Sequence, residues 1–375
     1  MNRHASLRAW LTLLRTPRLG GVGIRDQLAL HEHQPEAVLD ALRALAPNLP
    51  ADSRQWLLSP DKRRLDDDLA WLEQPGHRLL LCTDEDFPPS LEVIPQPPAA
   101  LFVVGDASLL LRPQLAIVGA RNATLGGRTL ARAFAREIGL AGFVITSGLA
   151  DGIDGAAHMA ALDAGLPTVA VVGTGPDRVY PSKHRGLARR LAAGGALVSE
   201  FPPGTPAKPD HFPRRNRLIS GLSLGTLVVE AGLESGSLIT ARLAAEQSRE
   251  VFALPGSIHN PLAHGCHRLI RDGARLVETA AEIVEVLAPA AVAMGRELAV
   301  RLGVPDVAEP GETILETDPS RRALLDSLGY GPVALEDLAA FTGEAVANLA
   351  SSLLMLELEG KVESLPGNRY QRLPG

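Results

Sequence analysis

The chain has 375 residues, of which 46% are hydrophobic and 21% charged, a balance that is typical of globular domains and excludes wholesale disorder. No apolar run approaches the roughly 20 residues of a membrane-spanning helix, and the stretch 9–14 is too short for a secretion signal. Cys82 and Cys266 cannot build a disulfide framework or a four-cysteine zinc site. We therefore expect a cytoplasmic protein of two or three domains.

Basic residues are concentrated in one stretch of an acidic chain. The formal net charge is −6, yet residues 178–217 carry nine Lys or Arg against Glu200 and Asp210. Such a concentration in an acidic protein indicates a local anion-binding site. A solvated, Arg-rich face is the alternative interpretation.

Residues 1–74 are predicted to form a small helical domain. Short helical stretches flank a Gly-rich turn at 19–24. This order of helix, glycine turn and helix is typical of helix-hairpin-helix or SAM-like modules, which can place backbone N–H groups against DNA phosphates. A plain helical turn is the alternative. Residues 75–113 are interrupted by prolines, so we expect an irregular lead-in packed against the next domain.

Apolar strands alternate with helical segments between residues 114 and 288. Strands are predicted at 115–119, 143–147, 168–172, 196–199, 226–229 and 251–254, and helices at 128–139, 154–164, 183–192 and 237–248. Strands that are apolar throughout and separated by helices indicate a parallel sheet covered on both faces. The predicted class is α/β, with a Rossmann-like doubly wound parallel sheet over residues 75–288.

The C-terminal part is predicted to be a winged helix over residues 313–375, after a linker at 289–312 that is rich in Ala, Val, Pro and Gly. Asp318 and Pro319 open a helix that ends at 328. Helices at 335–341 and 344–358 and a ribbon formed by 361–365 and 369–372 follow.

The last predicted helix of this domain, residues 344–359, contains no Lys or Arg and carries an apolar run at 353–358. Helices that read duplex DNA present basic and amide side chains to it. We therefore expect a protein-contact module, and the alternative is that the apolar run is used inside the domain.

The segment 117–124 joins the first core strand to a helix, where doubly wound folds bind phosphate. A dinucleotide site needs glycine at position 121, which is Arg121, and the second strand ends at Gly148 without the acidic residue that holds a ribose. The pattern argues against NAD and for a phosphate held by a guanidinium and helix amides. Pairing of Arg121 with a carboxylate is the alternative.

Two acid-rich or His-rich clusters could suggest metal or acid–base chemistry. Asp151, Asp154 and His158 are better explained as residues at a helix start, where carboxylates cap free N–H groups. The cluster at 259–267 lacks the second ligand pair that zinc sites use. We predict no bound metal.

The segment 180–221 combines cations, an amide, Phe201 and Phe212, which suits single-stranded nucleic acid because cations bind phosphates and rings stack on unpaired bases. Core packing is the expected role of at least one phenylalanine. Residues 235–237 begin another helix, where they could cap it or hold a phosphate.

Several motifs, in this order, resemble the bacterial DNA-processing protein A family, also called the Smf family. The resemblance covers about residues 75–288 and rests on the segments 117–121, 147–154 with His158, 212–221, 235–241 and 254–256. The helical N-terminus and the winged helix also fit longer members. At Asp151 the chain departs from the family, which usually has a basic or neutral residue there.

The resemblance implies single-stranded DNA binding in a basic pocket of the Rossmann-like domain, with Arg121, Lys183 and residues 214–217 lining it. It further implies loading of the RecA recombinase during natural transformation, and homodimers formed through the same domain. A nucleotide-phosphate hydrolase that uses Thr226 and Glu230 is the alternative; otherwise we expect no enzymatic activity and no cofactor. The candidate DNA-binding or phosphate-binding residues are Gly119, Arg121, Thr124, Gly148, Lys183, Arg185, Lys208, His211, Phe212, Arg214, Arg215, Asn216, Arg217, Ser220, Gly221, Ser235, Gly236 and Ser237.

Overall fold

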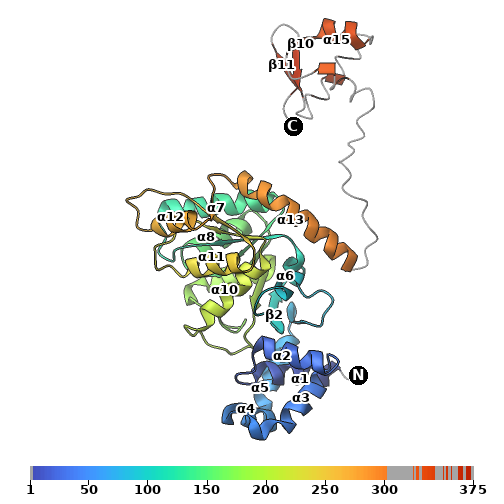
Figure 1. The fold of residues 1–375 in the computed structure, drawn as a ribbon, viewed down its shortest axis with the longest axis vertical. Helices are drawn as coiled ribbons and strands as arrows, with labels where there is room; N and C mark the ends of the chain where they lie inside the picture. The colour runs from blue at the N-terminus through green and yellow to red at the C-terminus, as the bar shows by residue number, and fades with distance from the viewer. Residues whose placement is uncertain are drawn as a thin grey trace. The chain divides into compact units, whose positions relative to one another are not determined.

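The chain forms two compact units, Met1–Pro305 and Asp306–Gly375 (Figure 1). The structure is a computed structural model that describes residues 3–301 and, in the second unit, residues 324, 327–328, 332–342, 349, 352–353, 356, 362–365 and 369–372. No helix of the described residues is long and apolar enough to cross a membrane.

Five helices form the N-terminal domain: α1 (Arg3–Arg15), α2 (Gly20–Leu30), α3 (Pro35–Ala44), α4 (Ala51–Leu58) and α5 (Lys62–Leu72). Their apolar faces enclose Trp10, which is 2% exposed. The glycines expected in a turn instead begin α2, and Gly20 has a φ of +55° that favours glycine. A Cβ atom on Gly21 would lie 2.9 Å from the Pro97 carbonyl oxygen, so this glycine allows a close approach.

A nine-stranded sheet follows, in the order β1-β2-β6-β5-β4-β3-β7-β8-β9. The strands β3 to β9 are parallel, and the six predicted strands are confirmed to within one residue at each end. The bounds are β1 (His77–Leu81), β2 (Ala100–Gly105), β3 (Gln114–Val118), β4 (Val144–Ser147), β5 (Thr168–Val171), β6 (Ala196–Ser199), β7 (Gly225–Val228), β8 (Glu250–Ala253) and β9 (Arg275–Leu276).

The expectation of an irregular lead-in at 75–113 is wrong, because β1 and β2 extend the sheet as an antiparallel hairpin beside β6. The prolines of this segment lie outside both strands. Leu79 and Phe102 of the hairpin share one buried cluster with the helices of the N-terminal domain. The helical domain and the sheet are therefore packed on a common core.

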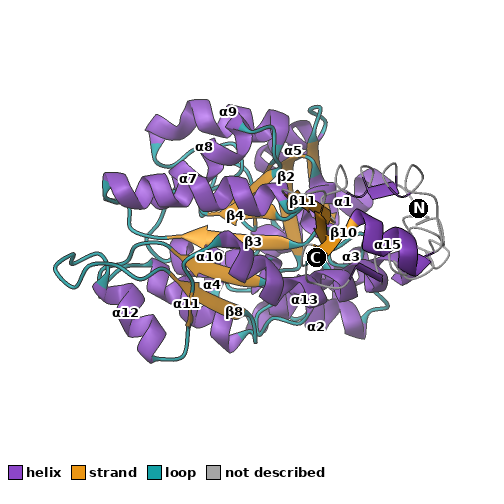
Figure 2. Cartoon of the chain, turned by 90° about the horizontal axis from the view of Figure 1, so that it is seen from above, coloured by secondary structure: helices purple, strands orange, loops and turns teal. Residues whose placement is uncertain are grey.

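Helices cover both faces of the sheet (Figure 2). Leu115 and Ile117 of β3 pack toward α7 (Leu125–Leu140), α8 (Ile153–Asp163) and α13 (Ala280–Arg301), whereas Ala116 and Val118 pack on the opposite side. The other helices are α6 (Pro89–Glu92), α9 (Arg185–Gly194), α10 (His211–Leu222), α11 (Ser237–Glu246) and α12 (His264–Arg271). The alternation along β3 is what a parallel strand buried on both faces requires.

The linker expected from residue 289 is instead helical as far as Arg301, since α13 continues through Pro289. Ile283 and Leu287 anchor its first half in the core, at 0% and 1% exposure. The remainder of the predicted linker, 302–312, lies outside the described residues.

The second unit contains a three-stranded antiparallel sheet in the order β10-β12-β11, with β10 (Val333–Ala334), β11 (Val362–Leu365) and β12 (Arg369–Arg372). The helix α15 (Leu335–Thr342) and both ribbon strands confirm their predictions. Most of the helices predicted at 318–328 and 344–358 lies outside the described residues. Leu353 and Leu356 are buried in the core of this unit, which favours use of the apolar run inside the domain.

Candidate nucleic-acid interface

The helix start that follows β3 is occupied by a side chain of the protein itself. The Glu230 carboxylate accepts hydrogen bonds from the Thr124 N–H at 2.9 Å and the Thr124 hydroxyl at 2.6 Å. That hydroxyl also caps α7 by accepting from the Gly127 N–H at 2.9 Å. The carboxylate thus takes the place of a bound phosphate at the helix N-terminus. Thr124 and the tightly packed Gly119 thus have structural roles at this turn.

An exposed cation and two aromatic rings meet near the carboxyl ends of β3 and β4. The Arg121 guanidinium lies 5.6 Å from the centroid of the Phe212 ring, and the Tyr180 ring lies 5.6 Å from the same ring. Tyr180 is 50% exposed and was not among the predicted site residues, although an aromatic residue beside a basic helix was the available signal. A notch of about 70 Å³ lies among Arg121, Gly148, Ala150, Asp151, Tyr180, Pro181, Phe212 and Arg215, which we call the Arg121 pocket.

Arg215 supports this pocket from inside the protein. Its guanidinium donates hydrogen bonds to the carbonyl oxygens of Gly148 and Val171. A Cβ atom on Gly148 would lie 1.8 Å from Arg215 Nη1, so a larger residue here would displace the guanidinium. Burial lowers the pKa of Arg215 to about 10, although the nearby Asp154 opposes the shift. Arg215 and Gly148 thus hold the pocket from inside the protein. The geometry favours this internal role over the predicted role of direct phosphate ligands.

Asp151 pairs with two basic residues and does not cap a helix, contrary to our interpretation. Its Oδ1 lies 3.0 Å from Lys183 Nζ and 3.0 Å from His184 Nε2. The N-cap of α8 is Gly152, without a side-chain cap. Lys183 stays 67% exposed, and exposed pairs of this kind are weak, so its charge remains available to a ligand.

Asp154 and His158 are buried structural groups. Asp154 accepts hydrogen bonds from the backbone N–H groups of Gly148 and Ala150, which fixes the loop before its own helix, and burial raises the pKa of this carboxyl. His158 Nδ1–H donates to the Thr168 hydroxyl, because that hydroxyl itself donates to a carbonyl. Burial lowers the pKa of His158 to about 3.

The two other arginines of α10 flank Glu200. Arg217 is 8% exposed and is hydrogen-bonded to the Glu200 carboxylate, which is also 3.6 Å from Arg214 Nη2. Burial lowers the pKa of Arg217, although Glu200 raises it. Arg214 is about half exposed and lies over the Phe201 ring at 5.0 Å. Of the two, only Arg214 presents its charge to solvent.

The rest of the predicted set in this helix belongs to the core. Asn216 and Ser220 are 9% and 0% exposed, and Ser220 bonds back to carbonyls of its own helix. Gly221 is buried against Leu91 and Ile94. Phe201 is buried too, stacked on His211 at 4.1 Å, which confirms core packing for one phenylalanine.

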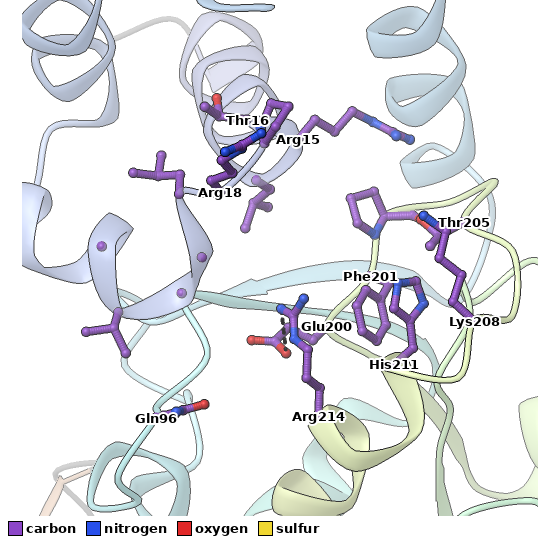
Figure 3. A pocket seen from close by; sticks show the side chains of 18 of the residues that line it. Arg15, Thr16, Arg18, Gln96, Glu200, Phe201, Thr205, Lys208, His211 and Arg214 are labelled. Carbon is purple, nitrogen blue, oxygen red and sulfur yellow. Dashed lines mark hydrogen bonds and ion pairs between the residues drawn. The ribbon is translucent and has the colours of Figure 1, made fainter. Parts of the chain in front are cut away.

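A larger cavity of about 710 Å³ lies between residues 14–23 and 200–217, and we call it the N-terminal cavity. Figure 3 shows Arg15 and Arg18 on the side of the helical domain, facing Lys208, His211 and Arg214. The predicted residues Lys208, His211 and Arg214 therefore lie in a different cavity from Arg121. Arg185 lines a third cavity, of about 680 Å³, with Tyr180.

Residues 235–237 lie at the start of α11 and outside the Arg121 pocket. The Ser235 and Ser237 hydroxyls are hydrogen-bonded to each other at 2.7 Å, and Gly236 is the N-cap. Ser235 lines a cavity of about 690 Å³ formed with β8 and α12. The structure does not bring these residues together with Arg121.

The histidines at 259–267 hold loops. His264 and His267 are hydrogen-bonded to the carbonyl oxygens of Ile258 and Gly256, at 2.9 and 3.0 Å. Among the described residues, no group of three or more His, Cys, Asp or Glu side chains could hold a metal ion.

The comparison with protein families decides the classification, since the model of DNA recombination-mediator protein A matches residues 78–288. The chain belongs to this family. A second family model, the winged helix domain of the same proteins, matches residues 308–368. Protein Smf of Escherichia coli is 40% identical over 376 residues, which cover 97% of this chain and 95% of that protein.

Two solved structures of DNA processing protein A share the fold. The Streptococcus pneumoniae protein is 35% identical, with a TM-score of 0.67 over 74% of this chain and 97% of that chain. The Helicobacter pylori protein, whose structure describes a single-stranded DNA binding mode, is 29% identical, with a TM-score of 0.52 over 57% of this chain and 96% of that chain. The family of DNA-processing proteins expected from the sequence motifs is thereby confirmed.

Proposed function

We propose that this recombination mediator binds single-stranded DNA at the Arg121 pocket. The observation that carries the proposal is the exposed cation of Arg121 beside the rings of Phe212 and Tyr180. A guanidinium can bind a phosphate while an accessible ring stacks on an unpaired base. The binding mode reported for the Helicobacter pylori relative supports the same ligand class.

The cations that remain accessible near the pocket determine how many phosphate contacts we expect. Arg121 is exposed and Lys183 stays 67% exposed beside Asp151, whereas Arg215 is bonded internally. We therefore expect Arg121 and Lys183 to contact phosphates and Arg215 to position the pocket. Duplex DNA of the same length should bind more weakly, because paired bases cannot reach the rings.

The test is the affinity of the R121A variant for an oligothymidylate over a range of salt concentrations, with R128A as the matched control. Arg128 is an exposed arginine of α7 that lies outside the Arg121 pocket. R121A should weaken binding, and the slope of log K against log[salt] should become shallower by about 0.7. Equal affinities for R121A and R128A would remove Arg121 from the interface.

We also propose that the bound strand is passed to the RecA recombinase and that the chain forms homodimers through its Rossmann-like domain. Membership in a family of recombination mediators supports the first proposal. Leu233 and Ile258 are among the exposed apolar side chains of this domain, at 53% and 73%, and are the positions chosen to test the second. Light scattering of an L233E/I258E variant tests the dimer, and strand exchange by RecA with the protein added tests the loading.

A nucleotide hydrolase is the less favoured function. Its expected acid, Glu230, is engaged by Thr124 and lies 3.4 Å from the Asn260 amide. The carboxylate thus has a structural role at the start of α7. We therefore propose a binding protein without turnover of nucleoside monophosphates, which a phosphate-release assay would check.

A further inference from the structure

The N-terminal cavity has the composition of a polyanion site. Arg18, Arg64, Lys208 and Arg214 line it, and Arg18 is paired with Asp52 at 3.1 Å. The acidic residue of the lining, Glu200, is bonded to the buried Arg217. Arg64 and Lys208 are exposed and form none of the ion pairs found in the described part of the chain. The cavity therefore holds an excess of uncompensated positive charge.

The start of α2 adds backbone donors to the same wall. Gly20, Gly21 and Gly23 line the cavity, and the helix has no side-chain N-cap. A Cβ atom on Gly20 would meet nothing within 4 Å, so the backbone is open on this side. Free N–H groups at a helix N-terminus attract anions, and the start of α2 lines the same cavity as Lys208 and Arg214.

Two further cavities share lining residues with the Arg121 pocket and with the N-terminal cavity. Tyr180 lines both the Arg121 pocket and the 680 Å³ cavity. That cavity shares Trp71 and Pro206 with one of about 570 Å³, which in turn shares Arg64 and Lys208 with the N-terminal cavity. Each cavity in this series therefore has at least one lining residue in common with the next.

The charges along this path suit a chain of phosphates. Arg178, Arg185 and Arg189 line the 680 Å³ cavity, with Asp177 as the acid. The 570 Å³ cavity is lined by Asp67, Asp68 and Asp177, and Asp68 is paired with Arg15 through two hydrogen bonds at 2.5 and 2.6 Å. Cations therefore predominate at both ends of the path.

We propose that a single strand leaving the Arg121 pocket continues along these cavities, and that its phosphodiester backbone is bound in the N-terminal cavity by Arg64, Lys208 and Arg214. The inference rests on the proposed function of the Arg121 pocket. It gives the helical domain a direct role in holding DNA. Short strands occupy only the Arg121 pocket, whereas longer strands reach both sites.

The test compares R64A/K208A with a matched control, R54A/R63A, in the full-length protein. All four side chains are exposed, and Arg54 and Arg63 lie on α4 and α5 outside these cavities. Fluorescence anisotropy is measured with oligothymidylates of about 6 and about 25 nucleotides. R64A/K208A should lower the affinity for the long strand about tenfold, with a salt slope shallower by about 1.4, and change the short strand less than about twofold.

Three outcomes separate the possible errors. If R121A leaves short-strand binding unchanged, the proposed function itself is wrong. If R121A weakens short strands but R64A/K208A matches R54A/R63A on the long strand, the extended path is wrong. In the third outcome, inorganic phosphate raises the melting temperature of the native protein and not of R64A/K208A, while R64A/K208A keeps the native affinity for the long strand. The cavity would then hold a small anion, and the strand assignment would be overturned.

Discussion

Neighbouring arginines of α10 have opposite roles because the helix turns by about 100° per residue. Arg214 faces solvent, whereas Arg215 and Arg217 are 5% and 8% exposed. Their partners, Gly148, Val171 and Glu200, come from separate parts of the chain. No local pattern in 214–217 could therefore show which cation binds DNA and which one holds the fold.

This difference predicts unequal effects on stability. R215A removes a buried cation and leaves Asp154 without its nearest positive charge, so the free energy of unfolding should fall by about 3 kcal/mol. R214A removes an exposed side chain and should cost less than about 1 kcal/mol. Urea denaturation measures both, and losses of similar size would contradict the internal role of Arg215.

His158 predicts a loss of stability in mild acid. Its pKa is about 3 in the folded state and about 6.5 when unfolded, so between these values the unfolded state binds a proton that the folded state does not. The stability is complete above pH 6.5 and should fall by about 2 kcal/mol from pH 7 to pH 5. In H158N the amide keeps the hydrogen bond to Thr168 and cannot titrate.

The measurement is urea denaturation of the native protein and of H158N at several pH values. The difference between the two curves isolates His158 from the carboxyl groups that titrate in both proteins. If the free energy of unfolding depends on pH in the same way in both proteins, His158 is not held neutral by burial.

At the scale of elements, the parallel strands could be predicted because each is a short apolar run between turn residues, as at 143–147. The run 100–104 of β2 is equally apolar, but the prolines around it concealed a strand that pairs antiparallel with β6. Pro289 likewise suggested a linker within α13. These elements depend on distant partners, whose packing overrides local signals.

The candidate site was predicted less well than the fold, for a related reason. The strand-to-helix turn at 119–124 has the form of an anion site, and the anion is supplied by Glu230, 106 residues away from Thr124. Arg121 was found because it replaces the glycine that a dinucleotide needs. Tyr180 lies beside a basic helix in the sequence, but only the tertiary structure brings its ring to Phe212 and Arg121. Arg64 was missed because only the tertiary structure brings it to a cavity with Lys208.

The start of α7 gives a prediction for one element. E230Q keeps the shape of the side chain and removes the negative charge at the helix N-terminus, so the free energy of unfolding should fall by about 1 kcal/mol. E234Q is the control, because Glu234 is exposed four residues later in the chain. A loss with E230Q no larger than with E234Q in urea denaturation would show that the carboxylate does not stabilise α7.

At the scale of the whole molecule, the proposed interface lies within the first unit. The common core of the N-terminal helices and the β1–β2 hairpin fixes Arg64 relative to the sheet that carries Arg121. Removal of residues 1–74 would therefore expose Leu79 and Phe102, which are 7% and 0% exposed. The helical domain should be treated as part of the folding unit rather than as a detachable module.

The second unit can be removed without loss of any proposed DNA contact. A chain that ends at residue 305 keeps the Arg121 pocket and the N-terminal cavity, and Asp306–Gly375 has its own buried cluster around Leu328 and Leu338. We expect the affinity for single strands to stay within about threefold of the full-length value, a difference of about 0.65 kcal/mol. Anisotropy with the long oligothymidylate measures it, and light scattering records the oligomeric state. A collapse of DNA binding with an unchanged oligomeric state would show that the winged helix is itself a DNA-binding element.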